Sequence, residues 1–410
     1  MLAALMGAPL RAVSVLVAAL TFPGVAKADP NDLALNRLSF FNNTPWENGG
    51  VRYDPSRWAF RGGCGTPATG GGGGQQYAQC FPDNQLFGRL VNELGGALAP
   101  SLMAPAMTLG PHGLYVGYEL SVSNLDRTSD HWRRGSQGSP TTVVGTDTST
   151  QRDNGDSAAV VSRLHVRKGL PFGFELGTQV SHLHSSSIWA IGLDLRWSLF
   201  EGFRHGIGYL PDFAVRGAVN TVVGQSQLQL TVVSADAVIS KRFTLGGVVR
   251  LTPYLGGQAL FIFGDSGVVD LTPSRSAYNE CPRQQIRYVP DMTSPSMQVG
   301  QLQCGSGGAL PSVNGAPIPA DLNDTRNSAV FQSMRIWRPR MFLGLQFQWE
   351  ILMVTAEFTT DVAGPQWLST PPTSAGRPST DPAQNNARQA VDLGGYTQWM
   401  TSVGVGLAFR

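Results

Sequence analysis

The sequence predicts an all-β protein: a transmembrane antiparallel β-barrel of about ten strands, or about twelve if residues 29–112 contribute two more, with a short, partly helical N-terminal segment. Three observations predict it. The chain begins with an export signal, it has no apolar run long enough for a membrane-spanning helix, and from about Gly113 apolar residues alternate with polar or small ones. Apart from helices, only a closed barrel satisfies every backbone polar group inside a membrane.

Residues 1–28 have the three parts of a secretory signal peptide. Arg11 supplies a positive charge, residues 13–20 form the apolar run, and Ala26-Lys27-Ala28 is a small-x-small cleavage site. The alternative is a short membrane anchor, but a spanning helix needs roughly 20 apolar residues. Cleavage removes Arg11 and Lys27 from the 30 basic residues, which leaves 28 basic against 28 acidic residues. This neutral balance argues against nucleic acid as a partner.

Ten alternating segments place large apolar side chains on one face and polar or small ones on the other, as membrane-barrel strands do. The clearest is residues 189–199, where Trp, Ile and Leu alternate with Gly192, Asp194 and Arg196. The expected strands lie within residues 114–122, 160–167, 172–181, 189–199, 213–220, 228–239, 253–263, 340–349, 352–358 and 399–409.

The sixth segment is less regular than the others. Leu228, Leu230 and Val232 share a face with Asp236, so a lipid-facing set of leucines would carry an acid into the membrane. We expect a bulge near Val232-Val233 that re-aims the strand and keeps Asp236 in the lumen.

An even strand number places all the long connections on one side. The polar loops 123–156, 264–330 and 362–394 follow the first, seventh and ninth strands, as expected for extracellular loops opposite short periplasmic turns. Trp189, Trp197, Trp349 and Trp399 lie near strand ends and predict an aromatic girdle. The alternative is a soluble β-sandwich, which rarely combines long Gly-rich insertions with so many large apolar residues on one face.

The last strand ends in Gly406-Leu407-Ala408-Phe409-Arg410. With the signal peptide and the strands, residues 113–410 resemble Gram-negative outer-membrane β-barrel proteins in general. This resemblance implies an outer-membrane location, contact with outer-membrane lipid and recognition by the barrel-assembly machinery. A terminal aromatic residue helps that recognition in the class; Phe409 is penultimate, so Arg410 departs from the pattern.

Residues 29–112 do not alternate. We expect Asp83 to cap a short helix over residues 85–98, with an apolar face formed by Leu86, Phe87, Leu90, Val91 and Leu94. The segment is either a periplasmic extension packed under the barrel or a plug inside the lumen. A plug would resemble the long-chain fatty-acid channels of the outer membrane, whose N-terminal segment enters the barrel. The Gly70–Gly74 run lacks the context of a phosphate-binding loop.

Four cysteines fall in two local pairs, Cys64 with Cys80 and Cys281 with Cys304. An oxidising compartment favours two disulfides, although four cysteines allow three pairings. Neither pair has CxxC spacing or a nearby His, so a metal site is less favoured.

The charged residues expected in the lumen have both signs in near balance. They are candidates for solute selectivity: Glu119, Arg163, Arg167, Glu175, Asp194, Arg196, Arg216 and Glu357. They can form a closed ion-pair network, or they can line a narrow polar pathway. The first hypothesis is passive passage of a small or hydrophobic solute that the sequence does not identify. The alternative is a structural or surface-interaction barrel with a closed lumen.

An outer-membrane hydrolase is a third hypothesis. His182, His184 and Ser185–Ser187 fall at the expected outer rim, where some outer-membrane enzymes use His with Ser or Asp. No acidic partner is evident in the sequence, and a surface metal site on the two histidines is a further alternative. We therefore predict no catalytic residue, no metal and no cofactor.

Overall fold

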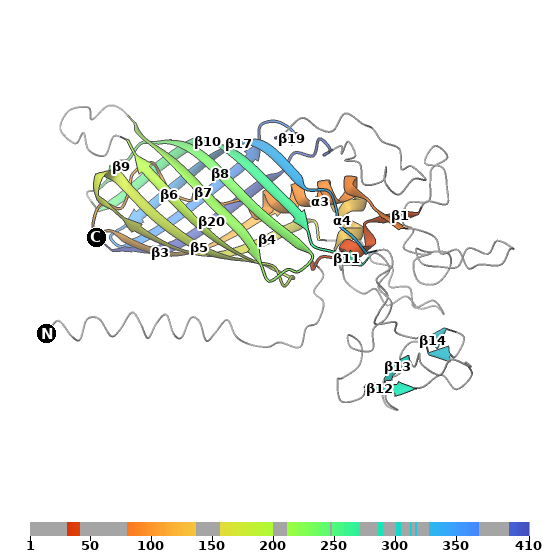
Figure 1. Cartoon of the computed structure of the whole chain (residues 1–410). Helices are drawn as coiled ribbons and strands as arrows, with labels where there is room; N and C mark the ends of the chain where they lie inside the picture. Colours follow the sequence, from red (N-terminus) through yellow and green to blue (C-terminus); the bar gives the residue numbers. More distant parts are fainter. Residues whose placement is uncertain are drawn as a thin grey trace.

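The structure is a computed structural model, and it describes residues 31–41, 80–136, 156–199, 211–246, 248–270, 286–289, 301–304, 312–313, 316–317, 328–368 and 393–409. Ten antiparallel strands form a closed barrel (Figure 1). They are β3 (Leu114–Asn124), β4 (Ala158–Gly169), β5 (Phe174–Leu183), β6 (Trp189–Ser198), β7 (Asp212–Val223), β8 (Leu228–Ser240), β10 (Val249–Ser266), β17 (Met334–Trp349), β18 (Leu352–Asp361) and β20 (Trp399–Phe409).

Two pairings close the wall. β20 pairs with β3 from Phe409↔Leu114 to Met400↔Ser123, and β10 pairs with β17 from Val249↔Trp349 to Gly264↔Met334. The predicted fold class, an antiparallel barrel of about ten strands, is confirmed. In the described part of residues 29–112, β1 (Ser39–Phe41) and β2 (Cys80–Pro82) pair with each other and add no strand to the wall. Among the described residues, the sheet also contains the short strands β9 (Phe243–Leu245) and β19 (Gln366–Trp367), on β10 and β17.

The remaining elements are not part of the barrel wall. They are η1 (Leu35–Arg37), α3 (Asn84–Ala97), α4 (Asp130–Gly135), η3 (Pro171–Gly173), β11 (Val269–Asp270), β12 (Ile286–Val289), β13 (Gln301–Cys304), β14 (Ser312–Val313), β15 (Ala316–Pro317) and β16 (Ser328–Ala329). β11 pairs with β16, which holds the two ends of the β10–β17 connection together.

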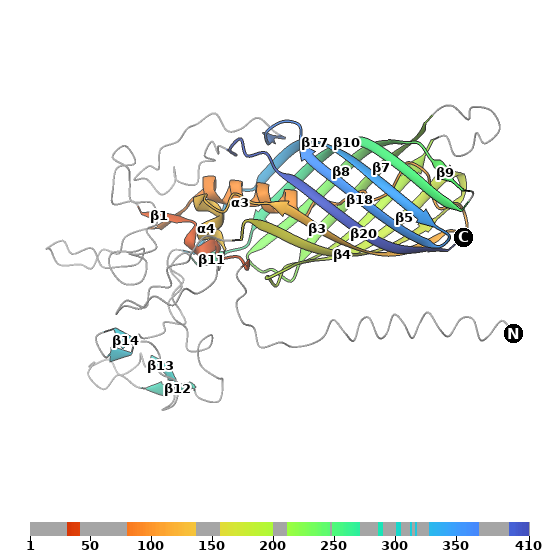
Figure 2. The same cartoon turned by 180° about the vertical axis from the view of Figure 1, so that it is seen from behind.

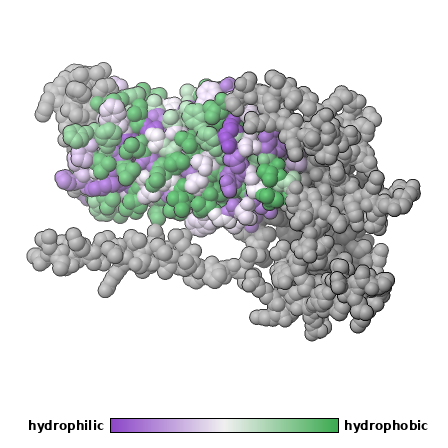
Figure 3. Space-filling view, in the orientation of Figure 1, coloured by the Kyte–Doolittle hydropathy of each residue, from purple (hydrophilic) through white to green (hydrophobic). Residues whose placement is uncertain are grey.

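The barrel exterior is apolar, as the alternation predicts. Burial alternates residue by residue along the strands, and the exposed set includes Leu193, Leu195, Leu343 and Val403. Figure 3 shows hydrophobic side chains over most of the described barrel surface. The four predicted girdle tryptophans are exposed: Trp189 and Trp399 at one end of the barrel, and Trp197 and Trp349 at the other. This is the exterior of a transmembrane β-barrel.

The two ends of the barrel differ. We call the end that carries the β3–β4, β10–β17 and β18–β20 connections the long-loop mouth, and the opposite end, with Leu114 and Phe409, the short-turn mouth. Helices α3 and α4 lie at the long-loop mouth, and the C-terminus lies at the short-turn mouth (Figures 1 and 2). All three predicted long loops leave from the same end.

The bulge expected in the sixth strand is wrong. β8 runs in one phase from Leu228 to Ser240, with unbroken register against β7 and β10. Leu228, Leu230 and Val232 face into the barrel together with Asp236. Apolar residues can face inward at this end because the interior there is filled by a hydrophobic helix, which the alternation rule does not anticipate.

Some strand boundaries also differ from expectation. β10 begins at Val249 rather than near Pro253, and β17 begins at Met334 rather than at Arg340. Pro339 lies inside β17 at the point where pairing with β18 ends, so its missing N–H costs no bond to that strand. Phe172, expected in the third strand, lies in η3 with a φ of 62° and is 90% exposed.

Candidate functional site: the filled barrel interior

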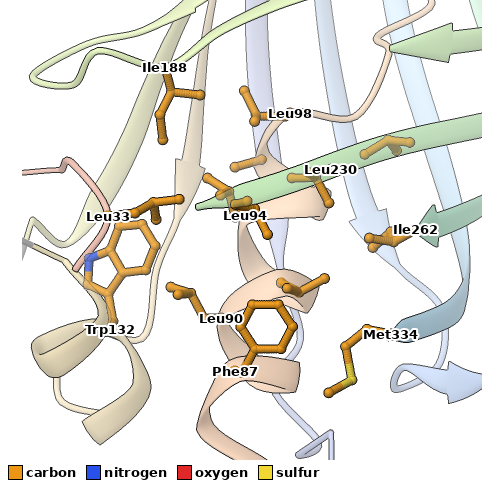
Figure 4. Close-up of a cluster of buried hydrophobic side chains, with 14 of the residues drawn as sticks. Leu33, Phe87, Leu90, Leu94, Leu98, Trp132, Ile188, Leu230, Ile262 and Met334 are labelled. Atoms are coloured by element: carbon orange, nitrogen blue, oxygen red, sulfur yellow. The ribbon is translucent and has the colours of Figure 1, made fainter. Parts of the chain in front are cut away.

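Helix α3 occupies the long-loop mouth. Asp83 caps it as predicted, since the carboxylate accepts hydrogen bonds from the N–H groups of Gln85 and Leu86, each 3.1 Å long. The apolar face of α3 meets inward-facing side chains of the wall and of α4, including Ile188, Leu230, Ile262, Met334 and Trp132 (Figure 4). The helix is therefore held in this mouth by the hydrophobic effect.

Two glycines allow the helix to approach β10 closely. A Cβ on Gly95 of α3 would lie 2.5 Å from Ile262, and a Cβ on Gly264 of β10 would lie 2.4 Å from Val91 of α3. Side chains at these positions would push the helix off the wall, because packed interiors have no room for an added methyl group.

Beyond α3, residues 98–110 run through the barrel without regular secondary structure, and we call them the threaded segment. Every residue from Leu90 to Ala106 is buried. Buried backbone groups outside helices and sheets need other hydrogen-bond partners. Side chains of the wall strands supply these partners. They bind residues 98–109 one after another from the long-loop mouth to the short-turn mouth.

Arginines of the wall bind carbonyl groups at the C-terminal end of α3 and in the threaded segment. Among the described residues six arginines are buried: Arg163, Arg167, Arg196, Arg216, Arg338 and Arg340. Each of them donates to at least one backbone carbonyl of residues 92–107.

The contacts nearest the long-loop mouth bind the carbonyl groups at the C-terminal end of α3. Arg340 donates to the carbonyl of Gly96 (3.2 Å), and Arg163 donates to those of Ala97 (3.2 Å) and Ala99 (3.1 Å). The last carbonyl groups of a helix have no partner inside it, and the negative end of the helix dipole attracts cations. The amide of Asn220 donates to the carbonyl of Leu98 (2.8 Å).

The contacts closer to the short-turn mouth bind carbonyl groups of the threaded segment. Arg216 donates to the carbonyls of Pro100 (3.1 Å) and Ser101 (2.6 Å). Arg167 donates to that of Leu102 (2.8 Å). Arg196 donates to those of Pro105 (2.8 Å) and Met107 (3.0 Å).

Carboxylates of the wall bind the N–H groups of the same segment. Glu357 accepts from the N–H of Met103 (2.9 Å) and from the hydroxyl of Tyr254 (2.8 Å). Glu175 accepts from the N–H of Leu109 (3.1 Å). The wall therefore presents donors and acceptors in an order that matches the backbone groups of residues 96–109.

The interior charges also pair with one another. Glu119 lies 2.7 Å from Arg163, Glu175 lies 2.8 Å from Arg196, and Asp236 lies 2.5 Å from Arg216. Ser101 of the threaded segment adds a 2.7 Å hydrogen bond to Glu119. Pairing of this kind offsets the cost of removing the charges from water.

All eight candidate lumen residues face the barrel interior and are buried: Glu119, Arg163, Arg167, Glu175, Asp194, Arg196, Arg216 and Glu357. Seven of them have the contacts with the threaded segment or with each other described above. Asp194 lies against Gly177, where a Cβ would come within 2.2 Å of its carboxylate. Their role in selectivity stays a prediction.

A further cluster was not among the candidates. Arg338 pairs with Asp361 and donates to the carbonyl of Asn92 (2.9 Å), while Gln398 accepts from Arg338 and donates to the carbonyl of Glu93 (3.2 Å). Arg338 and Gln398 fell outside the expected strands, and Asp361 just past one. Residues 334–339, Met-Arg-Ile-Trp-Arg-Pro, do not alternate between apolar and polar residues, so no local pattern indicated this cluster.

A small cavity lies in the interior near the short-turn mouth. The cavity has a volume of about 30 Å³ and is lined by Arg167, Glu175, Arg196, Arg242 and Tyr115, with Met107 and Thr108 of the threaded segment. This volume holds about two water molecules.

The rim histidines lie at the β5–β6 turn of the long-loop mouth. The ring of His182 is tilted against that of Trp189, with 4.4 Å between the centroids, and its Nε2 lies 3.0 Å from the carbonyl oxygen of Ser186. The Ser187 hydroxyl donates to Asp32 (2.7 Å). This places a serine with an acid, and a histidine with a tryptophan and a carbonyl, so the arrangement does not support nucleophilic catalysis. The hydrolase hypothesis stays untested.

The disulfide prediction stays open. Cys80 begins β2 and Cys304 ends β13, whereas Cys64 and Cys281 lie outside the described residues. Within the ranges that the structure describes, no group of three or more potential metal ligands occurs, and no helix is long and apolar enough to cross a membrane.

Fold and interior together define a closed barrel of outer-membrane type whose lumen contains part of its own chain. No family model matches the sequence, and no curated protein matches it. Solved structures with a similar fold include Ail, the attachment invasion locus protein of Yersinia pestis (9% identity, 73% of this chain and 99% of that chain, TM-score 0.22). They also include the KdgM porin (7%, 72% and 99%, TM-score 0.24) and LpxR from Salmonella typhimurium (9%, 70% and 99%, TM-score 0.23).

These neighbours are Gram-negative outer-membrane β-barrels, the class that the sequence resembles. The likenesses are too low to carry an argument about function, and the fold class rests on the strand pairing itself.

Proposed function

We propose that the protein is an outer-membrane barrel that is closed by its own residues 90–106 and anchors the elements at its long-loop mouth on the cell surface. The single observation that carries the proposal is the burial of Leu90–Ala106 with backbone groups bound by wall arginines and carboxylates. We therefore expect no continuous path for water or solutes, because this segment fills the interior and its backbone groups are bound to the surrounding wall.

The outer-membrane location is supported by the apolar belt, by tryptophans at both ends of the barrel and by the gathering of long connections at one mouth. In this orientation the long-loop mouth faces the cell exterior and the short-turn mouth faces the periplasm. Outer-membrane lipid and the barrel-assembly machinery are the expected partners, the latter through Phe409 near the end of β20.

The test is electrical conductance of the refolded protein in planar lipid bilayers. We expect the full chain to insert without a steady conductance. We expect a variant that lacks residues 31–109 to conduct, because the segment that fills the lumen is then absent. Each form must first show the heat-dependent gel mobility of a folded barrel. A steady, ohmic conductance of the full chain would sink the closed-barrel proposal.

Solute passage remains a second candidate, and one observation favours it. The threaded segment has no helix or sheet of its own below α3, and a cavity with charged walls already opens beside it near the short-turn mouth. In that case the full chain would open intermittently under voltage, and Arg196→Gln or Arg216→Gln would change the ion selectivity of the openings. Unchanged selectivity in both variants would argue against passage along this interior.

A further inference from the structure

The course of the N-terminal segment determines on which side of the membrane it lies. Asn31 donates its N–H to the carbonyl of Ser185 (2.8 Å), and its side chain donates to Asp156 (3.0 Å). Asp32 accepts hydrogen bonds from the N–H and the hydroxyl of Ser187 (2.6 and 2.7 Å). These partners lie in the β5–β6 turn and at the end of the β3–β4 connection, so the chain at Asn31 is attached to the long-loop mouth.

The following residues stay at the same mouth. Leu33 forms a bridge with Ser136 just after α4, and Leu35 and Leu38 are fully buried in the apolar cluster around α3. β1 then pairs with β2, and Phe41 and Cys80 therefore lie opposite each other at the long-loop mouth.

The chain crosses the barrel only after α3. Ala97 and Leu98 are bound near the long-loop mouth, and Leu109 is bound by Glu175 close to the short-turn mouth, where β3 begins at Leu114. A periplasmic N-terminal segment could join β3 directly at the short-turn mouth and would have no need of the lumen. The threaded segment thus connects an N-terminal part at one mouth with a first strand that starts at the other.

From this path we infer that residues 31–41 and 80–83 lie on the extracellular side of the barrel, next to helix α3 in its mouth, and that they reached this side through the lumen of their own barrel. The inference rests on the proposed orientation in the outer membrane. The β1–β2 pair is then part of the surface that the protein presents outside the cell.

The side of the membrane on which the N-terminal part lies is also fixed once the wall has closed. Helix α3 has a diameter of about 10 Å with its side chains and lies above a lumen crossed by buried arginines. Withdrawal into the periplasm would drag its apolar face past Arg163, Arg216 and Arg340 and leave their charges without the carbonyl groups that they bind. The described arrangement therefore has one stable side for residues 31–41 and 80–83.

The experiment places one epitope tag at three sites of the full-length chain in intact cells. The test site is the glycine run 70–74. The matched controls are residues 137–155 of the β3–β4 connection, at the long-loop mouth, and the turn 246–248 between β9 and β10, at the short-turn mouth. We expect antibody to label the tags at 70–74 and 137–155 on intact cells, and the tag at 246–248 only after the outer membrane is permeabilised.

Two failures are distinguishable. Labelling of 137–155 on intact cells with loss of labelling at 70–74 until permeabilisation would overturn the inference and leave the proposed orientation standing. Labelling of 246–248 on intact cells would overturn the orientation itself. Proteinase K treatment of cells with the untagged protein gives an independent readout: we expect cleavage within residues 42–79, and protection of these residues while 137–155 is cut would overturn the inference.

Discussion

Arg216 illustrates how one residue serves both the wall and the threaded segment. Its guanidinium pairs with Asp236 on the neighbouring strand and donates to the carbonyls of Pro100 and Ser101. A guanidinium suits this task because its planar group carries five donors. The sequence identified Arg216 as a lumen residue from alternation alone, but its main-chain partners could not be foreseen, since they are more than a hundred positions away in the chain.

Replacing Arg216 tests the worth of these contacts. Arg216→Met leaves the Asp236 carboxylate buried without its partner and two carbonyls without donors, so we expect a loss of about 3–5 kcal/mol in the free energy of unfolding. Arg335→Met is the matched control, because the Arg335–Asp265 pair is 36% and 38% exposed and such pairs contribute at most about 1 kcal/mol. Urea unfolding in lipid vesicles, followed by gel mobility, measures both. Equal losses would refute the assigned role of Arg216.

At the scale of elements, helix α3 was predicted almost to its ends. Asp83 as cap and the apolar face through Leu94 are local features, which the sequence displays directly. What the helix packs on was not visible, because inward-facing Leu230 and Ile262 alternate in the same way as lipid-facing residues. The mistaken bulge in β8 arose from this ambiguity, since alternation identifies two faces without naming which is inside.

The glycine at the contact between α3 and β10 offers a test of helix docking. In Gly95→Leu the new side chain meets Ile262 within the packed cluster, and we expect a loss of about 1–3 kcal/mol together with faster trypsin cleavage at Arg89. Gly217→Ala is the control: its Cβ meets nothing within 4 Å, so stability and cleavage should match those of the parent chain. Parent-like protection of Arg89 in Gly95→Leu would show that α3 is not held by this contact.

At the scale of the whole molecule, closure depends on strands that are far apart in the sequence. The β10–β17 pairing spans the longest connection, and β11 pairs with β16 so that Asp270 and Ser328 lie opposite each other. The connection therefore starts and ends at adjacent points of the long-loop mouth. Long surface connections add little to the entropy cost of closing such a loop.

Trimming this connection tests whether the barrel folds independently of residues 271–327. Replacing residues 271–327 by a short Gly/Ser linker should leave the barrel folded with a urea midpoint close to that of the parent chain. A larger cut of residues 264–330 removes the ends of β10 and the β11–β16 pair and should lower the midpoint. Gel mobility and urea titration compare the two. A comparable loss in both variants would indicate that residues 271–327 contribute to the wall.

The sequence alone determined that the protein is a barrel, that its strands have two distinct faces, that the long connections share one end and where the capped helix begins. These properties follow from the two-residue period of strands and from local capping chemistry, which neighbouring residues specify. Only the tertiary structure decided that the lumen is filled. Binding of carbonyls at residues 92–107 by Arg163, Arg216 and Arg340 needs the closed wall to bring distant residues together, and no local pattern records which backbone a buried arginine will bind.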